Sequence, residues 1–298
     1  LNPVSGMEQN SFLFLQCAQL GMSHADTLRY LLGLAAARAN VPLATAVPWE
    51  KGGTREPVAV LFGGDTAERQ VSVMTGTNVW LKLRRSLKYS PTPYLLAPDR
   101  TVWSVPYAQA LHHTVEEMVE ACVRSTEIEP RLASLRNDIV AKLELPVAVQ
   151  TETNFTPRAM TLDAFVANHS LVFLGLHGGI GEDGTVQQQL QMAGVAYTGS
   201  GPAASALCMN KYATGQCIST LDSDGISVAT KVRVPLKEVT NINQSTIEQR
   251  WQDLTEQLRT HSVIVKPIGD GCSAGVARLY SARDLKQYLV CTFKGVER

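Results

Sequence analysis

The chain has 298 residues, which at roughly 150 residues per domain is enough for about two domains with a sizeable core. Apolar residues make up 45% of the chain and charged residues 18%, a composition that excludes collagen, coiled coils and intrinsic disorder. The 27 Lys and Arg balance the 27 Asp and Glu, so the net charge favours neither nucleic acid nor an anionic membrane as partner. We therefore expect a small-molecule function.

Cysteines, hydropathy and the chain ends add further expectations. The six cysteines have no metal-ligand spacing, which indicates reduced thiols in an intracellular protein. No run of 18 apolar residues occurs, so no membrane span is predicted. The chain starts at Leu1 and stops after Arg298 with no terminal helix predicted. We expect a processed chain or a fragment, from which a targeting peptide could have been lost.

Near the start of the chain, residues 23–39 are predicted to form an amphipathic helix. Ser23 and Asp26 fit a capping box before a leucine- and alanine-rich stretch that ends ahead of Pro42. Residues 41–56 contain prolines, two adjacent glycines and no apolar period, which is typical of a linker.

The central region alternates short apolar runs with helical patterns, as parallel α/β sheets do. The expected strands are 58–62, 171–176 and 196–198, and the expected helices are 68–83, 114–124, 186–193 and 202–219. Residues 126–168 show weak periodicity and carry no firm prediction.

The last region is different. A polar helix is predicted over 245–260, followed by strands at 262–267 and 276–280 around the glycine-rich residues 269–275. Two strands joined by a glycine loop predict a hairpin, which differs from the strand-turn-helix of a Rossmann or P-loop nucleotide site.

Two glycine-rich segments follow the carboxyl ends of expected strands, where parallel α/β sheets bind ligands. The first is Gly63-Gly64-Asp65-Thr66-Ala67-Glu68, and the alternative for it is a plain turn with Glu68 favouring the helix dipole. The second is His177 to Gly184, with four glycines in eight residues. So many glycines predict close backbone approach or positive φ, although His177 alone could be a strand-end histidine bonded to loop carbonyls.

A lysine beside a glycine loop is the third candidate. Lys266 ends the strand before residues 269–275, and an amide-rich loop with a cation can hold nucleotide phosphates. A hairpin with a solvated lysine is the alternative. Lys211 on a helix is weaker still when taken alone.

The order of these segments resembles D-alanine–D-alanine ligases of the ATP-grasp superfamily. The resemblance rests on VAVLFGGDTAERQVSVMTG, LGLHGGIGEDGTVQQQLQMAGVAYTGSGPAASALCMNKYAT and VIVKPIGDGCSAGVARL, and it covers about residue 57 to the end. It implies a Rossmann-like parallel-sheet α/β domain of the pre-ATP-grasp type over 57–200, which binds substrate, and an incomplete ATP-grasp α+β domain over 201–298.

The same resemblance implies site residues. Lys211 and Lys266 match the lysines that contact ATP phosphates, and the closing loop corresponds to Gly269, Gly271, Ser273 and Gly275. Glu68 matches the glutamate that orients the first D-alanine, with His177 nearby. Cys272 stands where the family has a substrate-positioning serine, and because a thiol is a weaker hydrogen-bonding group, either Ser273 substitutes or positioning is impaired.

Residues 1–40 resemble the end of a preceding ligase copy, as in tandem plant and algal relatives. Asn2 matches an asparagine that ligates Mg²⁺, Gly6 a backbone donor to the tetrahedral oxyanion, and Ser11 a serine at the substrate. Ser5 replaces the family's proline, and an ordinary N-terminal loop and helix is the alternative.

The implied reaction is ATP-dependent formation of a C–N bond between two D-alanines through an acylphosphate, in peptidoglycan precursor synthesis. ATP and Mg²⁺ or Mn²⁺ are the implied cofactors, and Glu68, Ser273 and Gly6 the catalytic residues. Because the family's adenine clamp, arginine and acidic metal ligands have no counterpart in the chain, we expect it to be inactive as written.

Alternatives remain open. One is a non-catalytic nucleotide-binding or regulatory module, and another is a ligase with D-lactate or D-serine as acceptor. Expected partners are small molecules, with no nucleic acid or membrane, and either a homodimer or pairing of repeats within one polypeptide. The expected location is the cytoplasm, or a plastid for a plant or algal chain.

Overall fold

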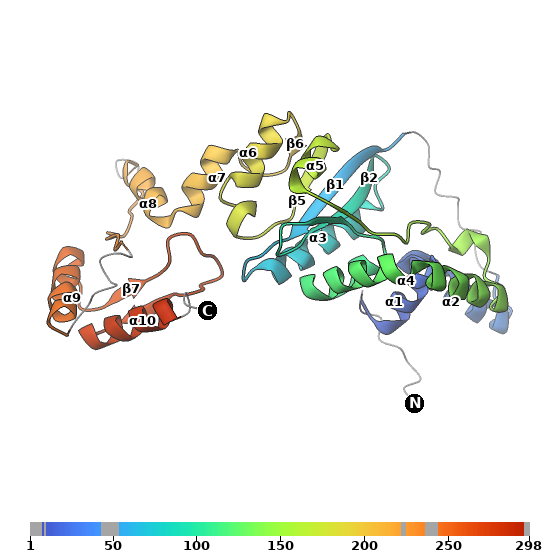
Figure 1. The fold of residues 1–298 in the computed structure, drawn as a ribbon, viewed down its shortest axis with the longest axis horizontal. Coiled ribbons are helices and arrows are strands. Elements are labelled where there is room, and N and C mark those ends of the chain that lie inside the picture. The colour runs from blue at the N-terminus through green and yellow to red at the C-terminus, as the bar shows by residue number, and fades with distance from the viewer. Residues whose placement is uncertain (1–7, 9, 43–53, 222–224, 236–243, 295–298) are drawn as a thin grey trace. The chain divides into compact units, whose positions relative to one another are not determined.

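The computed structural model describes residues 8, 10–42, 54–221, 225–235 and 244–294. The chain divides into two compact units (Figure 1). The first contains residues 1–177 and 186–199, and the second contains residues 178–185 and 200–298. Most of the predicted linker, residues 43–53, lies outside the described residues. The domain boundaries expected from the sequence stay a prediction.

The first unit is built on a six-stranded sheet in the order β4-β3-β2-β1-β5-β6. The strands are β1 (Glu56–Gly63), β2 (Tyr89–Leu96), β3 (Val102–Ser104), β4 (Arg158–Met160), β5 (Leu171–Leu174) and β6 (Ala196–Tyr197). Strands β2, β1, β5 and β6 pair in parallel, whereas β3 and β4 add antiparallel. The expected α/β class with a mainly parallel sheet is confirmed.

Strand β1 runs through the centre of this sheet, and its residues from Val58 to Gly63 are all buried. One face of the strand packs under α3 (Arg69–Leu83), α4 (Val115–Lys142) and α1 (Phe12–Gln19) in a single apolar core. Burial on both faces explains why the sequence shows a continuous apolar run here rather than alternation. The short helices α5 (Leu162–Ala167) and α6 (Thr185–Met192) complete the described helices around the sheet.

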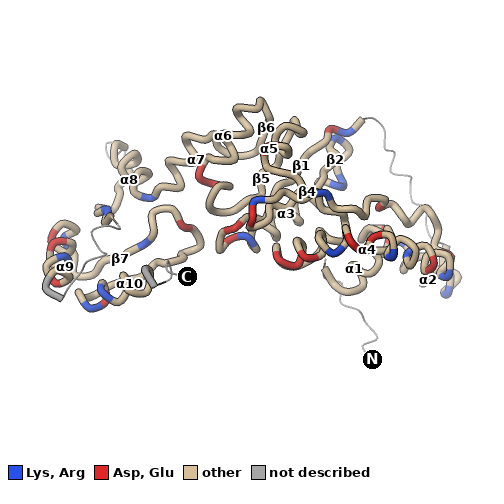
Figure 2. Tube along the Cα trace, viewed as in Figure 1, with Lys and Arg blue, Asp and Glu red and all other residues tan. Residues whose placement is uncertain are grey.

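Helix α4 corrects one expectation. Predicted to end near Arg124, it continues to Lys142 and contains Pro130. Its buried residues stop at Ser125, so the second half has no apolar stripe facing a core and gives no helical period in the sequence. Figure 2 shows acidic and basic residues interspersed along this helix and along α9 (Gln244–Leu258), which is consistent with the balanced charge.

The N-terminal helices belong to the first unit. Helix α2 (His24–Ala39) begins with the predicted capping box, in which Ser23 and Asp26 exchange side-chain and backbone bonds. Asp26 is only 1% exposed, and its carboxylate also accepts a 2.5 Å hydrogen bond from the Thr151 hydroxyl. The backbone N–H of Glu152 donates to the carbonyl of Gly21 at 2.9 Å. The helix start is therefore bonded to a segment more than a hundred residues away.

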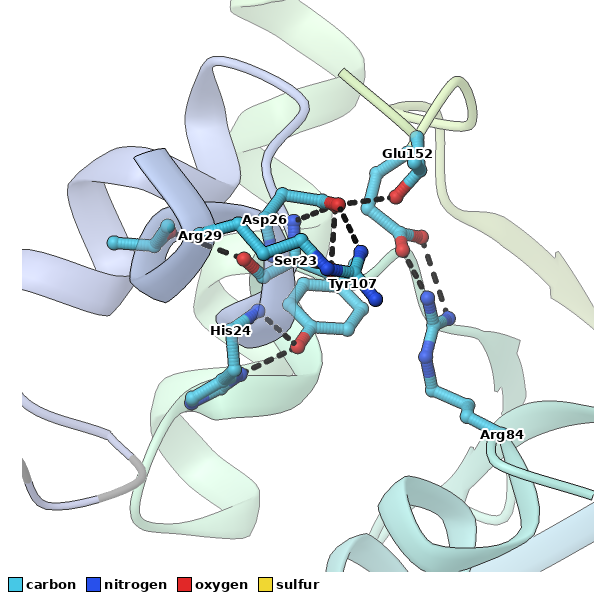
Figure 3. A network of polar contacts seen from close by, with 9 residues as sticks. Ser23, His24, Asp26, Arg29, Arg84, Tyr107 and Glu152 are labelled. Carbon is cyan, nitrogen blue, oxygen red and sulfur yellow. Dashed lines mark hydrogen bonds and ion pairs between the residues drawn. The ribbon is translucent and has the colours of Figure 1, made fainter. Parts of the chain in front are cut away.

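His24, Tyr107 and Arg84 complete this junction (Figure 3). The backbone N–H of His24 donates to the Tyr107 hydroxyl at 3.1 Å, and the His24 ring bonds the same hydroxyl. Arg84 lies over the Tyr107 ring, 4.6 Å from its centroid, and pairs with Glu152. Burial raises the pKa of Tyr107 to about 12, so the phenol stays protonated.

The second unit contains a small antiparallel hairpin covered by helices. Strands β7 (Val263–Val265) and β8 (Ala277–Leu279) pair with each other, as the sequence predicts. Helices α9 and α10 (Ala282–Lys294) pack against them around Ile247, Leu254 and Leu285. The expectation of no terminal helix is wrong, because α10 runs to Lys294, the last residue that the structure describes.

The stretch 202–219, expected as one helix, is two: α7 (Pro202–Met209) and α8 (Lys211–Ser219). Asn210 lies between them in an extended conformation, and its side chain accepts hydrogen bonds from the N–H groups of Tyr212 and Ala213. An asparagine that caps a new helix competes with continuation of the old one. The break makes Lys211 the first residue of α8.

Candidate functional site

The two glycine segments of the first unit meet at the carboxyl ends of β1 and β5. Gly63 has φ +101°, and a Cβ there would overlap the carbonyl of Leu96, so only glycine fits. The Ser72 hydroxyl accepts from the N–H of Gly63 at 2.8 Å and donates to the carbonyl of Gly175 at 2.7 Å. This fully buried serine on α3 joins the ends of the two strands.

Glu68 and His177 are brought together through Thr66. The Thr66 hydroxyl donates to the carbonyl of His177 at 2.9 Å and accepts from the N–H of Glu68 at 3.2 Å. The His177 Nε2 atom lies 3.0 Å from the Thr75 hydroxyl on α3. Thr66 therefore joins the backbones of two residues that lie 109 positions apart in the sequence, and Thr75 contacts the His177 ring.

The start of α3 is fixed from outside by α4. Arg69 and Gln70 donate to the two carboxylate oxygens of Glu116 at 2.6 and 2.7 Å. The pKa of Glu116 is lowered, first by its own backbone N–H and then by Arg69. Because Arg69 directly follows Glu68, this exposed pair restrains the backbone that carries Glu68.

The glycines after His177 adopt the predicted backbone conformations. Gly178, Gly179 and Gly184 have φ of +70°, +47° and +94°, values that side chains disfavour. A Cβ on Gly184 would also overlap the carbonyl of Pro202. The density of glycine in this segment thus has a local steric cause.

In the second unit, Lys211 and Lys266 line one cavity of about 220 Å³. Lys211 bonds the start of the glycine loop. Its backbone N–H and its ammonium both donate to the carbonyl of Ile268, at 3.1 and 3.4 Å. The ammonium also donates to the carbonyl of Asp270. Lys266 directly follows β7. The two lysines of the sequence prediction are brought together here.

The charged residues that line the cavity are all basic, and most of the other lining residues are apolar. Its apolar lining includes Leu254, Leu258, Val263 and Leu285, and its remaining cations are Lys231, Arg233 and Arg250. No Asp or Glu is part of the lining that the described residues form. Such a cavity suits a ligand with an apolar body and several negative charges.

The glycine loop, Gly269 to Gly275, is a compact turn. Ala274 N–H bonds the carbonyl of Gly271 at 2.9 Å, and the Tyr288 hydroxyl bonds the carbonyl of Gly275 at 2.7 Å. Cys272 and Ser273 are exposed and have φ of +47° and +58°. Consecutive non-glycine residues in this region are uncommon, and they store backbone strain in the loop.

Other predicted site residues are placed differently. Asn2 and Gly6 lie outside the described residues. Ser11 caps α1, and its buried Oγ makes no hydrogen bond. No set of three or more His, Cys, Asp or Glu arranged for a metal ion occurs in the part of the chain that the structure describes. All six cysteines are free.

Sequence reasoning missed Thr66, Ser72, Thr75 and Lys231. The first three lie on the inward face of α3 or in the turn before it. The polar residues that follow the first glycine segment were the feature of the sequence that could have predicted them. Lys231 carries no local pattern that separates it from a solvated lysine.

In the part of the chain described, no helix is long and apolar enough to cross a bilayer.

Comparison with known proteins shows what the chain is similar to. Residues 57–200 match the family model described as D-ala D-ala ligase N-terminus. The D-alanine–D-alanine ligase of Leptospira interrogans is 29% identical over 237 residues, covering 80% of this chain and 58% of the relative. That of a Methylobacterium species is 30% identical over 241 residues, covering 80% and 53%. The chain spans little more than half the length of these relatives.

Solved structures share the fold. D-alanyl-alanine synthetase A from Vibrio cholerae matches with a TM-score of 0.51 at 17% identity, over 82% of this chain and 57% of that one. The VanG D-Ala:D-Ser ligase from Enterococcus faecalis matches with a TM-score of 0.52 at 19% identity, over 81% and 60%. Residues 57–200 are therefore similar to the D-ala D-ala ligase N-terminus family, and about 80% of the chain is similar to D-alanine–D-alanine ligases.

Proposed function

We propose that this chain supplies the substrate-binding and phosphate-binding parts of an ATP-dependent D-alanine–D-alanine ligase. The observation that carries the proposal is the cavity in the second unit, where Lys211 and Lys266 lie beside a strained glycine loop. The named relatives are D-alanine–D-alanine ligases, which supports the substrate assignment.

The second unit would bind ATP. Two ammonium groups neutralise phosphate charge, and the apolar lining accommodates a flat base. The chemistry that ATP supplies is phosphorylation of a carboxylate, which activates it for attack by an amine. The glycine loop has the composition needed to close over the phosphates and keep water from an acylphosphate. Ser273 would act within this loop. Cys272 stands at the position of the family's serine, so either Ser273 substitutes for that serine or substrate positioning is impaired.

The first unit would bind the first D-alanine. Glu68 has a negative charge suited to an ammonium group, and the Thr66 bonds join the backbone of Glu68 to that of His177. Ser11, with its unbonded Oγ, is a proposed contact to substrate.

The residues described do not fit a divalent metal site. They contain no ligand cluster, and Asn2, the proposed ligand, lies outside them. Mg²⁺ or Mn²⁺ stays a proposal from the family. Intracellular location is likewise a proposal. The bacterial relatives give the plastid no support.

The family match ending at residue 200 and the second unit resuming at Ser200 support a domain boundary there. The proposed organisation is a substrate domain over 57–200 and ATP-grasp residues from 201. Residues 1–40 would derive from a preceding copy, although α1 and α2 pack within the first unit.

Calorimetric titration of the purified chain with ATP tests the proposal. We expect ATP to bind the wild-type chain and to bind Lys211→Met and Lys266→Met at least tenfold more weakly, because each loses a charge-assisted bond. Lys88→Met removes an exposed lysine of the first unit and is the matched control. Absence of ATP binding would contradict the proposal, whereas ATP binding without any D-alanine binding would favour a regulatory module.

A further inference from the structure

Lys231 lines the same cavity as Lys211 and Lys266. Its Nζ atom donates to the backbone carbonyl of Lys211 at 3.2 Å. An ammonium has three donors, and this bond uses one of them. Lys231 is thus anchored at the first residue of α8 with donors to spare.

Helix α8 is shaped to receive this side chain. A Cβ on Gly215 would overlap the Lys231 ammonium and approach its Cδ and Cε atoms to 2.9 and 3.0 Å. Gly215 is a buried helix residue with ordinary helical φ, so its backbone does not require glycine. Glycine inside a helix lowers helix stability relative to alanine. The space it leaves is taken by Lys231.

The charges around Lys231 call for an anion. Lys211, Lys266, Arg233 and Arg250 line the same cavity, which no described carboxylate lines. Like charges that line one cavity repel one another, and the amino end of α8 adds partial positive charge. A polyphosphate would relieve this repulsion, whereas a neutral or singly charged ligand would relieve little of it.

We propose that Lys231 is a third phosphate-binding cation of the nucleotide site. It is positioned by the space that Gly215 leaves on α8, here called the notch of Gly215, and by the carbonyl of Lys211. The inference deepens the proposed function and rests on it. Lys231 acts on the phosphate chain together with Lys211, so its contribution grows with the number of phosphates.

The test compares ATP, ADP and adenosine in calorimetric titrations. Lys231→Met is expected to weaken ATP binding by about 5- to 30-fold, to weaken ADP binding less, and to leave adenosine binding unchanged. A defect of folding would instead weaken all three. Lys88→Met is again the charge-matched control.

Gly215→Ala gives an independent perturbation that removes no charge. The added methyl meets the flexible end of Lys231, so the helix should fold while the lysine is displaced. We expect a loss of ATP affinity similar to that of Lys231→Met, and no further loss in the double variant. Gly33→Ala, where a Cβ meets nothing within 4 Å, is the control.

The outcomes separate the two claims. If the wild-type chain does not bind ATP, the proposed function and this inference both fall. If the wild-type chain binds ATP but Lys231→Met binds it within twofold, or loses affinity equally for adenosine, only the assignment of Lys231 is overturned.

Discussion

Gly76 on α3 offers a sharp test of how the first unit is packed. A Cβ at this position would overlap Phe62 of β1 at its Cβ, Cγ and Cδ1 atoms, and Phe62 is completely buried. Because the overlap includes the Cβ of Phe62, no rotamer change relieves it. The helix and the strand would have to separate.

The magnitude follows from two opposing terms. Alanine is favoured over glycine inside a helix by about 1 kcal/mol, whereas forcing a methyl into a packed core costs about 1–3 kcal/mol. The overlap with a fixed Cβ places Gly76→Ala at the upper end of that cost. We expect a net loss of about 1–2 kcal/mol in the free energy of unfolding.

Urea unfolding followed by tryptophan fluorescence measures this change, since Trp80 is buried on the same helix. With a slope of about 2 kcal/mol per molar urea, the midpoint should fall by about 0.5–1 M. Gly33→Ala on α2, in the same unit and with open space around it, should raise the midpoint instead. A Gly76→Ala variant as stable as the wild type would refute the close approach of α3 to β1.

Three further predictions use the cited pKa shifts and contacts. Burial raises the pKa of Cys122 to about 12, so in native protein Cys122 should resist a thiol reagent that labels exposed Cys208, and equal labelling rates would contradict this. The pKa of Tyr107 is about 12 in the folded protein and 10 in the free side chain, so the unfolded chain loses this proton first. The free energy of unfolding should therefore decline from pH 10 to 12, and it should decline less in Tyr107→Phe. Urea unfolding at pH 9 and 11 measures both changes. Thr75→Val should change the NMR chemical shift of the His177 Nε2 atom, because it removes the hydroxyl at that atom, whereas Thr75→Ser should retain the contact. Identical chemical shifts in all three proteins would exclude it.

Much of the local structure follows from the sequence because its causes lie within a few residues. The capping box at Ser23 starts α2 as expected, and the apolar run of β1 predicts a strand buried on both faces. Strand β2 was not predicted because it contains Pro91 and Pro93, and proline lacks the N–H that a central strand uses. The two prolines have the same parity, so their missing donors face one side. On that side β3 pairs with Tyr94 to Leu96, and the Pro93 carbonyl still accepts from the N–H of Val105 at 3.0 Å. The ladder therefore ends where the prolines lack a donor.

The site divides in the same way. The sequence alone determined that Glu68 and His177 follow strand ends and that Lys266 precedes a glycine loop. Strands, turns and loops depend on residues that are neighbours in the sequence, so a short segment is enough to predict them. Only the tertiary structure decided that Thr66 joins Glu68 to His177 and that Lys231 lies in the notch of Gly215. Such pairings depend on how elements distant in the chain pack together, and the periodicity of a single segment holds no information about its partner.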